Sequence, residues 1–215
     1  MQEQGVFISF EGIDGAGKSS HIEILAERLR SAGRRVTVTR EPGGTPLAEQ
    51  LRELVLQQPM DGLTEAMLVF AARRDHLVRL IVPALRSGAV VLSDRFTDSS
   101  FAYQGGGQGL ALAVLQQLEH WVQADIAAAP CGLLQPDMTL WFDLPPAQAA
   151  QRLAQARSPD RFEARAQEFF VRVRDAYAAR ALAEPARFVR IDAAAERGAV
   201  WQAVESAVRA RGWMA

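Results

Sequence analysis

The sequence predicts an α/β fold built on a five-stranded parallel sheet that helices flank on both faces. Five short runs rich in β-branched and aromatic residues alternate with helical patterns along the 215 residues, which is the order that a parallel sheet requires. The first run passes directly into a glycine-rich loop and then into a helix. The strands are expected at 6–10, 35–39, 89–93, 138–144 and 188–191.

Helices are expected between the strands because apolar residues recur there at spacings of three and four. The first helical pattern shows this spacing in Ile22, Leu25, Ala26 and Leu29, and Gly33 follows it as a stop signal. Prolines open two of the later helices. The expected helices cover 21–32, 46–57, 63–87, 110–129, 146–156, 161–182 and 199–211.

Length and composition indicate a single domain, 1–215, in which an arginine-rich segment near 152–165 forms a lid. The formal net charge of −1 argues against a protein that binds nucleic acid, because such proteins carry a basic surface. No uninterrupted apolar stretch of about 18 residues is present, and residues 1–4 lack a signal-peptide pattern. We therefore expect no membrane segment and a cytoplasmic protein. The single cysteine, Cys131, excludes an internal disulfide.

The segment from Gly12 to Ser19 reads G-x-x-x-x-G-K-S and follows the first strand. Glycines in this P-loop pattern let successive backbone N–H groups converge on a polyphosphate, and the helix after it adds its positive dipole end. Lys18 is expected at the β- and γ-phosphates, and the Ser19 hydroxyl at Mg²⁺. A glycine-rich turn that only caps a helix is the alternative, and the strand–loop–helix context argues against it. The expected ATP-binding residues are Gly12, Ile13, Asp14, Gly15, Ala16, Gly17, Lys18, Ser19 and Ser20.

Charged residues follow the second and third strands, at the sheet edge where ligands of parallel-sheet proteins gather. Arg40 and Glu41 precede a glycine pair that permits close backbone approach, although the same residues could form a bare turn. Asp94 ends the third strand as a candidate magnesium ligand, and Arg95 is a candidate phosphate clamp. An ordinary ion pair in a loop is the alternative for these two. Asp143 is a weaker metal candidate because no polar partner follows it.

Two further features point to a second ligand. Phe70 and Arg74 are spaced i and i+4, so a ring and a guanidinium on one helix face could bind a base. A core aromatic beside a snorkelling arginine is the alternative. Arginines also concentrate near 152–165, where a closing lid would bring positive charge to a phosphoryl group, although a solvated helix face would look the same. The three histidines show no metal-ligand spacing.

Taken in order, these segments resemble bacterial thymidylate kinases, which transfer phosphate from ATP to thymidine monophosphate (dTMP). The resemblance implies a P-loop NTPase fold, Mg²⁺ as cofactor, ATP and dTMP as nucleotide partners, and a homodimer. Two other functions are the alternatives. A nucleoside kinase would need no phosphate clamp at Arg95, and a nucleotide-dependent switch would need no second nucleotide pocket. The segments that carry the resemblance are E-G and the P-loop at 11–19, T-R-E-P-G-G-T at 39–45, F-A-A-R-R at 70–74, D-R at 94–95 and A-Y-Q-G-G-G at 102–107.

The same resemblance implies roles for individual residues. Phe70 would stack on thymine, Arg74 and Ser100 would bond its polar edge, and Arg95 with Arg40 nearby would hold the acceptor phosphate. The remaining implied roles are Pro42 and Gln104 lining the nucleotide site, Tyr103 under the sugar where a 2′-hydroxyl would clash, Glu11 and Asp94 organising Mg²⁺ and the acceptor, and Arg152 with residues 192–194 contacting adenine.

The family divides over the position of its catalytic arginine, which lies either in the P-loop or in the lid. Residues 13–16 in the P-loop include no arginine, so the chain resembles the lid-arginine type. Either Arg157 or Arg161 would then join Lys18 and Arg95 as catalytic cations. The spacing around 158–159 leaves both lid residues open.

Overall fold

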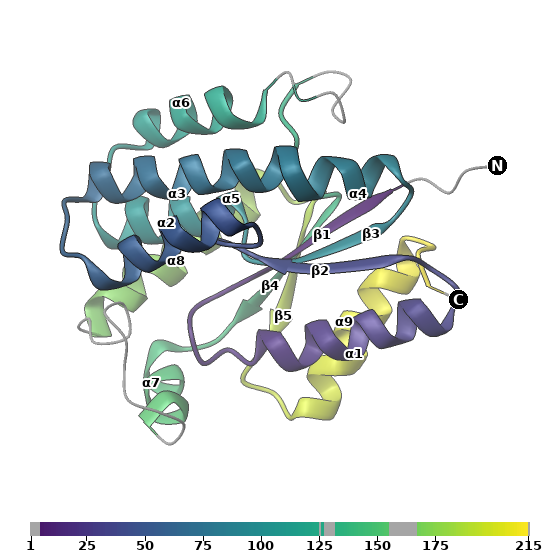
Figure 1. Cartoon of the computed structure of the whole chain (residues 1–215). Helices are drawn as coiled ribbons and strands as arrows, with labels where there is room; N and C mark the ends of the chain where they lie inside the picture. Colours follow the sequence, from purple (N-terminus) through teal and green to yellow (C-terminus); the bar gives the residue numbers. More distant parts are fainter. Residues whose placement is uncertain (1–4, 125, 127–131, 155–166, 215) are drawn as a thin grey trace.

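The computed structural model describes residues 5–124, 126, 132–154 and 167–214, and it shows the predicted parallel sheet with helices on both faces (Figure 1). The strand order is β2-β3-β1-β4-β5, so the strand that leads into the glycine-rich loop is central. Each strand begins and ends within one residue of its predicted bounds. The strands are β1 (Val6–Glu11), β2 (Val36–Arg40), β3 (Val90–Asp94), β4 (Met138–Asp143) and β5 (Phe188–Asp192).

Helices connect the strands, and most begin close to their predicted positions. The pattern predicted as one helix over 63–87 forms three consecutive helical segments, of which the middle one, η1, is π-helical. The helix predicted over 110–129 ends at Gln123, because Ala124 is extended and pairs with Leu133 in an antiparallel bridge. The segments are α1 (Lys18–Ser31), α2 (Pro46–Gln57), α3 (Gly62–His76), η1 (Leu77–Ile81), α4 (Val82–Arg86), α6 (Leu112–Gln123), α7 (Pro146–Ala154), α8 (Gln167–Ala183) and α9 (Arg197–Ala210).

Alternate residues of the central strand pack into two hydrophobic cores. Ile8 and Phe10 belong to the larger core, which includes buried residues of α1 and α9, whereas Phe7 packs with residues of η1 and α4. Figure 1 shows α1 and α9 together on one side of the sheet, with α3 and α4 on the other. Within the described ranges, none of the helices combines the length and apolar character needed to cross a membrane.

The register of the central strands brings their carboxyl ends to one edge of the sheet. Phe10 in β1 lies opposite Asp94 in β3, and Asp94 lies opposite Arg40 in β2. Glu11, the last residue of β1, lies opposite Trp141 in β4. Because these parallel strands end together, the loops that follow β1, β2 and β3 meet in one place.

Two segments that follow β3 were not predicted: α5 (Thr97–Ser100) and the π-helical segment η2 (Phe101–Gly107). Three glycines in η2 lower its intrinsic helix propensity, so propensity alone predicts a turn. Packing explains the glycines: a Cβ on Gly106 would lie 2.6 Å from the Cβ of Ala176 in α8. The close approach of η2 to α8 therefore determines this segment.

Candidate active site

The loop after β1 is shaped by three glycines with positive φ. Gly12, Gly15 and Gly17 have φ angles of 134°, 80° and 84°, values that residues with a Cβ rarely adopt. At Gly12 a Cβ would also lie 2.5 Å from the carbonyl oxygen of Phe142 in β4. Helix α1 begins after this loop, and its N-cap, Gly17, has no side chain to occupy the first N–H groups. These groups and the helix dipole can therefore bind a phosphate.

Lys18 points back into this loop. Its Nζ donates hydrogen bonds to the carbonyl oxygens of Gly12 (3.2 Å) and Ile13 (3.4 Å), and it lies 3.9 Å from Asp94 Oδ1. Burial and then the nearby Arg95 guanidinium lower the pKa of Lys18 from its ordinary value. The ammonium group is therefore held beside the loop, where it can act as a cation for a bound phosphate.

Asp94 and Ser19 offer oxygen ligands beside the same loop. Both residues line one surface hollow next to α1, and Ser19 is exposed. Asp94 Oδ1 is buried and accepts no hydrogen bond from the part of the chain that the structure describes. A carboxylate oxygen without a hydrogen bond and an exposed hydroxyl suit Mg²⁺, which takes few protein ligands and completes its shell with phosphate and water oxygens.

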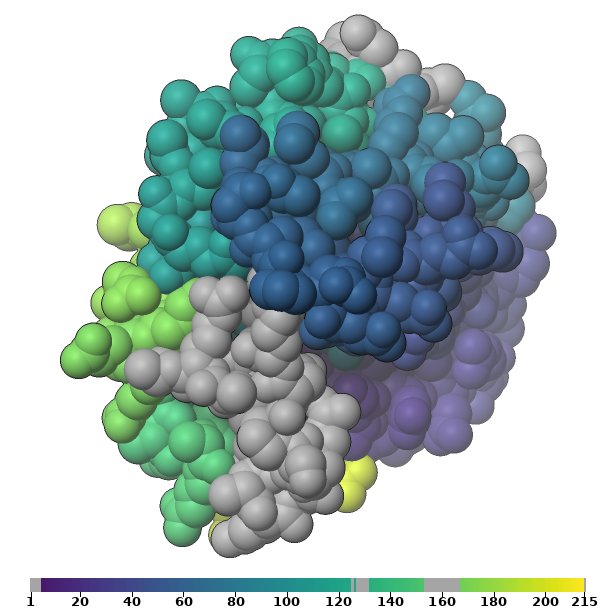
Figure 2. Space-filling model, turned by 60° about the vertical axis from the view of Figure 1, so that its left-hand side comes forward, coloured from purple at the N-terminus to yellow at the C-terminus, as the bar shows by residue number. Residues whose placement is uncertain are grey.

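A cavity lies next to the loop, among α2, α3 and η2. Figure 2 shows this side of the molecule, where the blue surface of α2 and α3 adjoins the teal surface of residues 100–123. The cavity combines three arginines with an apolar wall, which suits an anion that carries an apolar ring. Its lining comprises Arg52, Arg73 and Arg95, the apolar Val55, Leu56 and Val69, and Asp14, Glu41, Pro42, Ser99, Ser100, Tyr103 and Gln104.

Arg95 joins the cavity to the phosphate loop. Its Nη2 donates to Asp14 Oδ1 (2.8 Å) and Tyr103 Oη (3.0 Å), and its Nη1 donates to Tyr177 Oη (3.2 Å). Its backbone is left-handed, with φ 72°, which is costly for a residue with a Cβ and is typical of functional sites. Burial opposes ionisation of Asp14, but the charges of Arg95 and Lys18 prevail and lower the pKa of Asp14 to about 2.

Arg73 is almost inaccessible to solvent, with 1% of its surface exposed. Its Nε donates to Glu41 Oε2 (2.7 Å), and its Nη2 donates to Phe96 O (3.2 Å) and Ser100 Oγ (3.0 Å). Its Nη1 is also buried but has no hydrogen-bond partner among the described residues. Because a buried N–H group without an acceptor is destabilising, this atom is a candidate donor to a ligand oxygen.

Glu41 holds Arg73 in place and is itself held from a second side. His76 Nδ1 lies 3.0 Å from Glu41 Oε1, and His76 Nε2 lies 2.7 Å from Thr39 Oγ1. Burial would raise the pKa of Glu41, but the Arg73 guanidinium outweighs burial and lowers it. The position of Arg73 is therefore fixed by a buried ion pair that extends from the end of β2 to α3.

The structure shifts the predicted aromatic–arginine pair by one residue. Arg74 is exposed and its Nη1 donates to Val122 O (2.9 Å), whereas Arg73 lines the cavity. Phe70 is buried in a core that includes residues of α6, and the Arg73 guanidinium lies 4.5 Å from its ring centre. Val69, four residues before Arg73, is the α3 side chain that lines the cavity. Packing of α3 against α6 sets this rotation, which residue spacing alone does not reveal.

Arg52, and not the predicted Arg40, lines the cavity together with Arg73 and Arg95. Arg40 is exposed, pairs with Glu49 Oε2 (2.9 Å) and lines the hollow next to α1. Arg52, in α2, donates from Nη1 to Pro42 O (2.8 Å). Arg52 was not predicted as a site residue because it lies in a regular helical pattern without a local motif. Arg52 reaches the site only because α2 packs beside the cavity in the folded chain.

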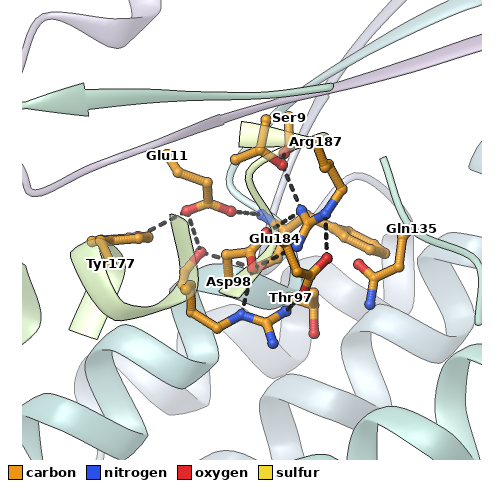
Figure 3. A network of polar contacts seen from close by, with 12 residues as sticks. Ser9, Glu11, Thr97, Asp98, Gln135, Tyr177, Glu184 and Arg187 are labelled. Atoms are coloured by element: carbon orange, nitrogen blue, oxygen red, sulfur yellow. Dashed lines mark hydrogen bonds and ion pairs between the residues drawn. The ribbon is translucent and has the colours of Figure 1, made fainter. Parts of the chain in front are cut away.

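Helix α5 is anchored behind the cavity by a buried ion-pair network (Figure 3). Asp98, which is fully buried, accepts hydrogen bonds from Arg187 Nη1 (2.6 Å) and Arg180 Nε (2.9 Å). Arg187 Nη1 also donates to Thr139 Oγ1 (2.6 Å) in β4. Burial would raise the pKa of Asp98, but its bonds to Arg187 and Arg180 lower it. The network therefore connects α5, which carries the cavity residues Ser99 and Ser100, to α8 and to the sheet.

Glu11 connects β1 to the same segment. Its Oε1 accepts from Phe96 N (2.7 Å), and its Oε2 accepts from Tyr177 Oη (2.7 Å) and Ser99 Oγ (3.1 Å). Burial, followed by the negative charge of Asp98, raises the pKa of Glu11 from 4.5 to about 7. Glu11 does not line the cavity among the described residues, so its role here is to position the backbone and side chains that do.

The remaining predicted contacts lie at two places. Pro42, Ser100, Tyr103 and Gln104 line the cavity with Arg95. Arg152 in α7 donates from Nη2 to Ala193 O (3.1 Å), just after β5, so the two segments expected at adenine are in contact. The two lid candidates, Arg157 and Arg161, lie outside the described residues.

Comparison with known proteins identifies the family to which the chain is similar. A family model described as thymidylate kinase matches residues 10–204. The chain is 62% identical over 214 residues to the thymidylate kinase of Albidiferax ferrireducens, covering all of both proteins. It is 62% identical over 200 residues to that of Paracidovorax citrulli, covering 93% of this chain and 90% of that protein. The crystal structure of thymidylate kinase from Ehrlichia chaffeensis has a TM-score of 0.76 and 34% identity, covering 96% of this chain and 99% of that one.

Proposed function

Because the chain belongs to the thymidylate kinase family and phosphorylates dTMP in dTTP synthesis, we propose that the cavity binds dTMP and that the loop after β1 binds ATP. The observation that carries this assignment is the contact between the two sites. Arg95 lines the cavity, and it bonds Asp14 of the phosphate loop at 2.8 Å. Phosphoryl transfer requires donor and acceptor phosphates to meet in this way.

In the acceptor cavity, Arg95 and Arg52 bind the dTMP phosphate, and the apolar wall that includes Val69 packs on thymine. The buried Nη1 of Arg73, which has no hydrogen-bond partner among the described residues, supports a hydrogen bond to a carbonyl oxygen of the base. Ser100 supports that contact indirectly because its Oγ accepts from Arg73 Nη2 (3.0 Å). The cavity therefore separates the two chemical parts of the nucleotide: charge at one end, and an apolar ring with a polar edge at the other.

In the donor site, the backbone of residues 12–20 and Lys18 bind the ATP phosphates. Asp94 and Ser19 would hold Mg²⁺. Their oxygen atoms support this assignment, as does Asp94 Oδ1, which accepts no hydrogen bond within the described ranges. The ion supplies positive charge to the phosphate oxygens of ATP when it is bound there. Arg152 and the segment after β5 bind adenine, which the bond from Arg152 to Ala193 supports.

The reaction is an in-line displacement in which an oxygen of the dTMP phosphate attacks the γ-phosphorus and the bond to ADP breaks. No general base is needed, because an ionised phosphate oxygen is already nucleophilic. The obstacle is repulsion between two anions, and Lys18 and Arg95 offset it where charge develops in the transition state. Arg157 or Arg161 provides a further cation in this proposal.

We also propose that the protein is a cytoplasmic homodimer. Exposed apolar side chains occur on both α3 and α6, which lie side by side in Figure 1, and exposed apolar surface can mark an interface. These side chains are Leu63, Met67, Leu112 and Trp121, each 44% to 68% exposed. Light scattering should give twice the chain mass of 23.5 kDa. A constant 23.5 kDa at micromolar concentrations would rule out the dimer.

The function is tested by a coupled assay of ADP release with ATP, Mg²⁺ and a panel of nucleoside monophosphates and nucleosides. Strong preference for dTMP is expected, because the cavity supplies cations for an acceptor phosphate and a polar edge for the base. Preference for thymidine over dTMP would contradict the phosphate role of Arg95 and Arg52. ADP release at one slow rate with or without an acceptor would leave only a nucleotide binder.

A further inference from the structure

A buried carboxylate controls the orientation of an amide in the acceptor cavity. Gln104 lines the cavity and is 4% exposed, and its Nε2 donates to Glu65 Oε1 (2.9 Å). Glu65 lies in the first turn of α3 and is fully buried. The Nε2 of Gln108 donates to the same Glu65 oxygen. Carboxylate oxygens accept hydrogen bonds, so both amides turn their NH₂ groups toward Glu65. The carbonyl oxygen of Gln104 is then the group that can accept from a ligand.

Arg73 provides the complementary group in the same cavity. Its Nη1 is a buried donor without a hydrogen-bond partner among the described residues. One donor and one acceptor thus belong to residues of the same cavity wall. Thymine presents a matching edge, with the O4 acceptor next to the N3–H donor. Cytosine presents the reverse order, with an amino donor at C4 next to an N3 acceptor.

We propose that Glu65 is a positioning residue for base specificity. By fixing the amide of Gln104, Glu65 sets the cavity to accept a base that donates from N3 and to reject a base that accepts there. This inference rests on the assignment of the cavity as the dTMP site. Glu65 does not line the cavity among the described residues, and it acts through Gln104.

The physical reason is that the wrong base leaves buried groups unpaired on both sides. Deoxycytidine monophosphate (dCMP) would place its N3 lone pair against the Gln104 oxygen and its amino group against Arg73 Nη1. A site built to hydrogen-bond one pattern rejects the reversed pattern strongly for this reason. With Glu65→Gln, position 65 can donate as well as accept, so the Gln104 amide can turn over and present its NH₂ group to N3 of cytosine.

The test compares kcat/KM for dTMP, deoxyuridine monophosphate (dUMP) and dCMP in the wild type and in Glu65→Gln. The ratio of dTMP to dCMP should fall by about tenfold or more, the factor expected from one hydrogen-bond mismatch. The ratio of dTMP to dUMP should stay within about twofold, because both bases have the same O4 and N3–H edge. Gln108→Met is the matched control, since it removes the other amide donor of Glu65 and should leave both ratios unchanged.

Two further variants separate orientation from a general loss of structure. The double variant Glu65→Met/Gln108→Met replaces both polar partners with apolar groups of similar shape, and it should lower the dTMP-to-dCMP ratio as Glu65→Gln does. In a Gln104→Met background, adding Glu65→Gln should not change the ratio further, because the amide that Glu65 orients is gone. Thermal melting with and without dTMP identifies variants that are folded.

Several results would overturn the inference. An unchanged dTMP-to-dCMP ratio in folded Glu65 variants would do so, as would an equal loss for all three nucleotides, which is the result of a purely structural role. A ratio that falls equally in Gln108→Met would also do so. If the wild type phosphorylated neither dTMP nor dUMP, the assignment of the cavity itself would fail, which is a separate outcome.

Discussion

The phosphate loop and the acceptor cavity meet at Arg95, yet they use different parts of the chain to bind ligands. The loop relies on its backbone: positive-φ glycines shape it, and carbonyl oxygens hold Lys18. The cavity relies on side chains that other buried side chains fix, as Glu41 fixes Arg73. A backbone site can recognise phosphate charge, which all nucleotides share. Side chains with fixed donors and acceptors can recognise a base, which identifies one nucleotide among several.

The largest effect is expected on stability, when the buried ion-pair network that anchors the cavity residues loses its carboxylate. Asp98→Ala leaves the buried Arg187 and the partly buried Arg180 without their shared carboxylate, which should lower the free energy of unfolding by about 3–5 kcal/mol. Urea denaturation measures this change. The control is Glu205→Gln, which breaks an exposed pair with Arg209 and should cost less than about 1 kcal/mol. Equal losses in the two variants would show that the network does not anchor the cavity.

A slightly smaller effect is expected in the loop, and it should appear in activity rather than stability. Lys18→Ala removes the cation that the loop carbonyls hold, and the transfer barrier should rise by about 3 kcal/mol, the range found for a major electrostatic donor. The measurement is kcat at saturating ATP and dTMP, with urea denaturation beside it. A kcat near the wild-type value in Lys18→Ala would show that Lys18 does not stabilise the transition state.

The same contrast explains how much of the site could be predicted from sequence. The loop is local, so its glycines and Lys18 identify it, and the periodic strands could be placed within one residue. The cavity depends on contacts between distant segments. Residue spacing pointed to Arg74, but packing of α3 against α6 turns Arg73 to the cavity instead. The pairing of Glu65 with Gln104 spans 39 positions, and no local pattern marks it.

Glu11 lies between the two regions, and pH can test how its burial affects stability. The pKa of Glu11 is about 7 in the folded protein against an ordinary 4.5, so the folded state binds this proton more tightly. Its contribution to stability is therefore greatest below pH 4.5 and is lost as pH rises through 7. Glu11→Gln does not titrate at this position. The stability of the wild type relative to this variant should fall by roughly 3 kcal/mol from pH 4.5 to 8.

Denaturation curves at several pH values measure that difference. A difference that stays constant with pH would show that burial and the charge of Asp98 do not raise the pKa of Glu11 as the structure indicates.

The smallest effect is expected on the KM for dTMP, when an arginine that lines the cavity is compared with one that lies outside it. Arg52→Gln removes a cation from the cavity, so the KM for dTMP should rise about tenfold, which is about 1.4 kcal/mol. Arg40→Gln removes an exposed cation that pairs with Glu49 outside the cavity, and the KM for dTMP should change less than about threefold. Because both changes remove one positive charge, the pair controls for general electrostatic attraction of the nucleotide. A larger effect at Arg40 would place the acceptor phosphate in the hollow beside α1 and would reverse the roles of the two arginines.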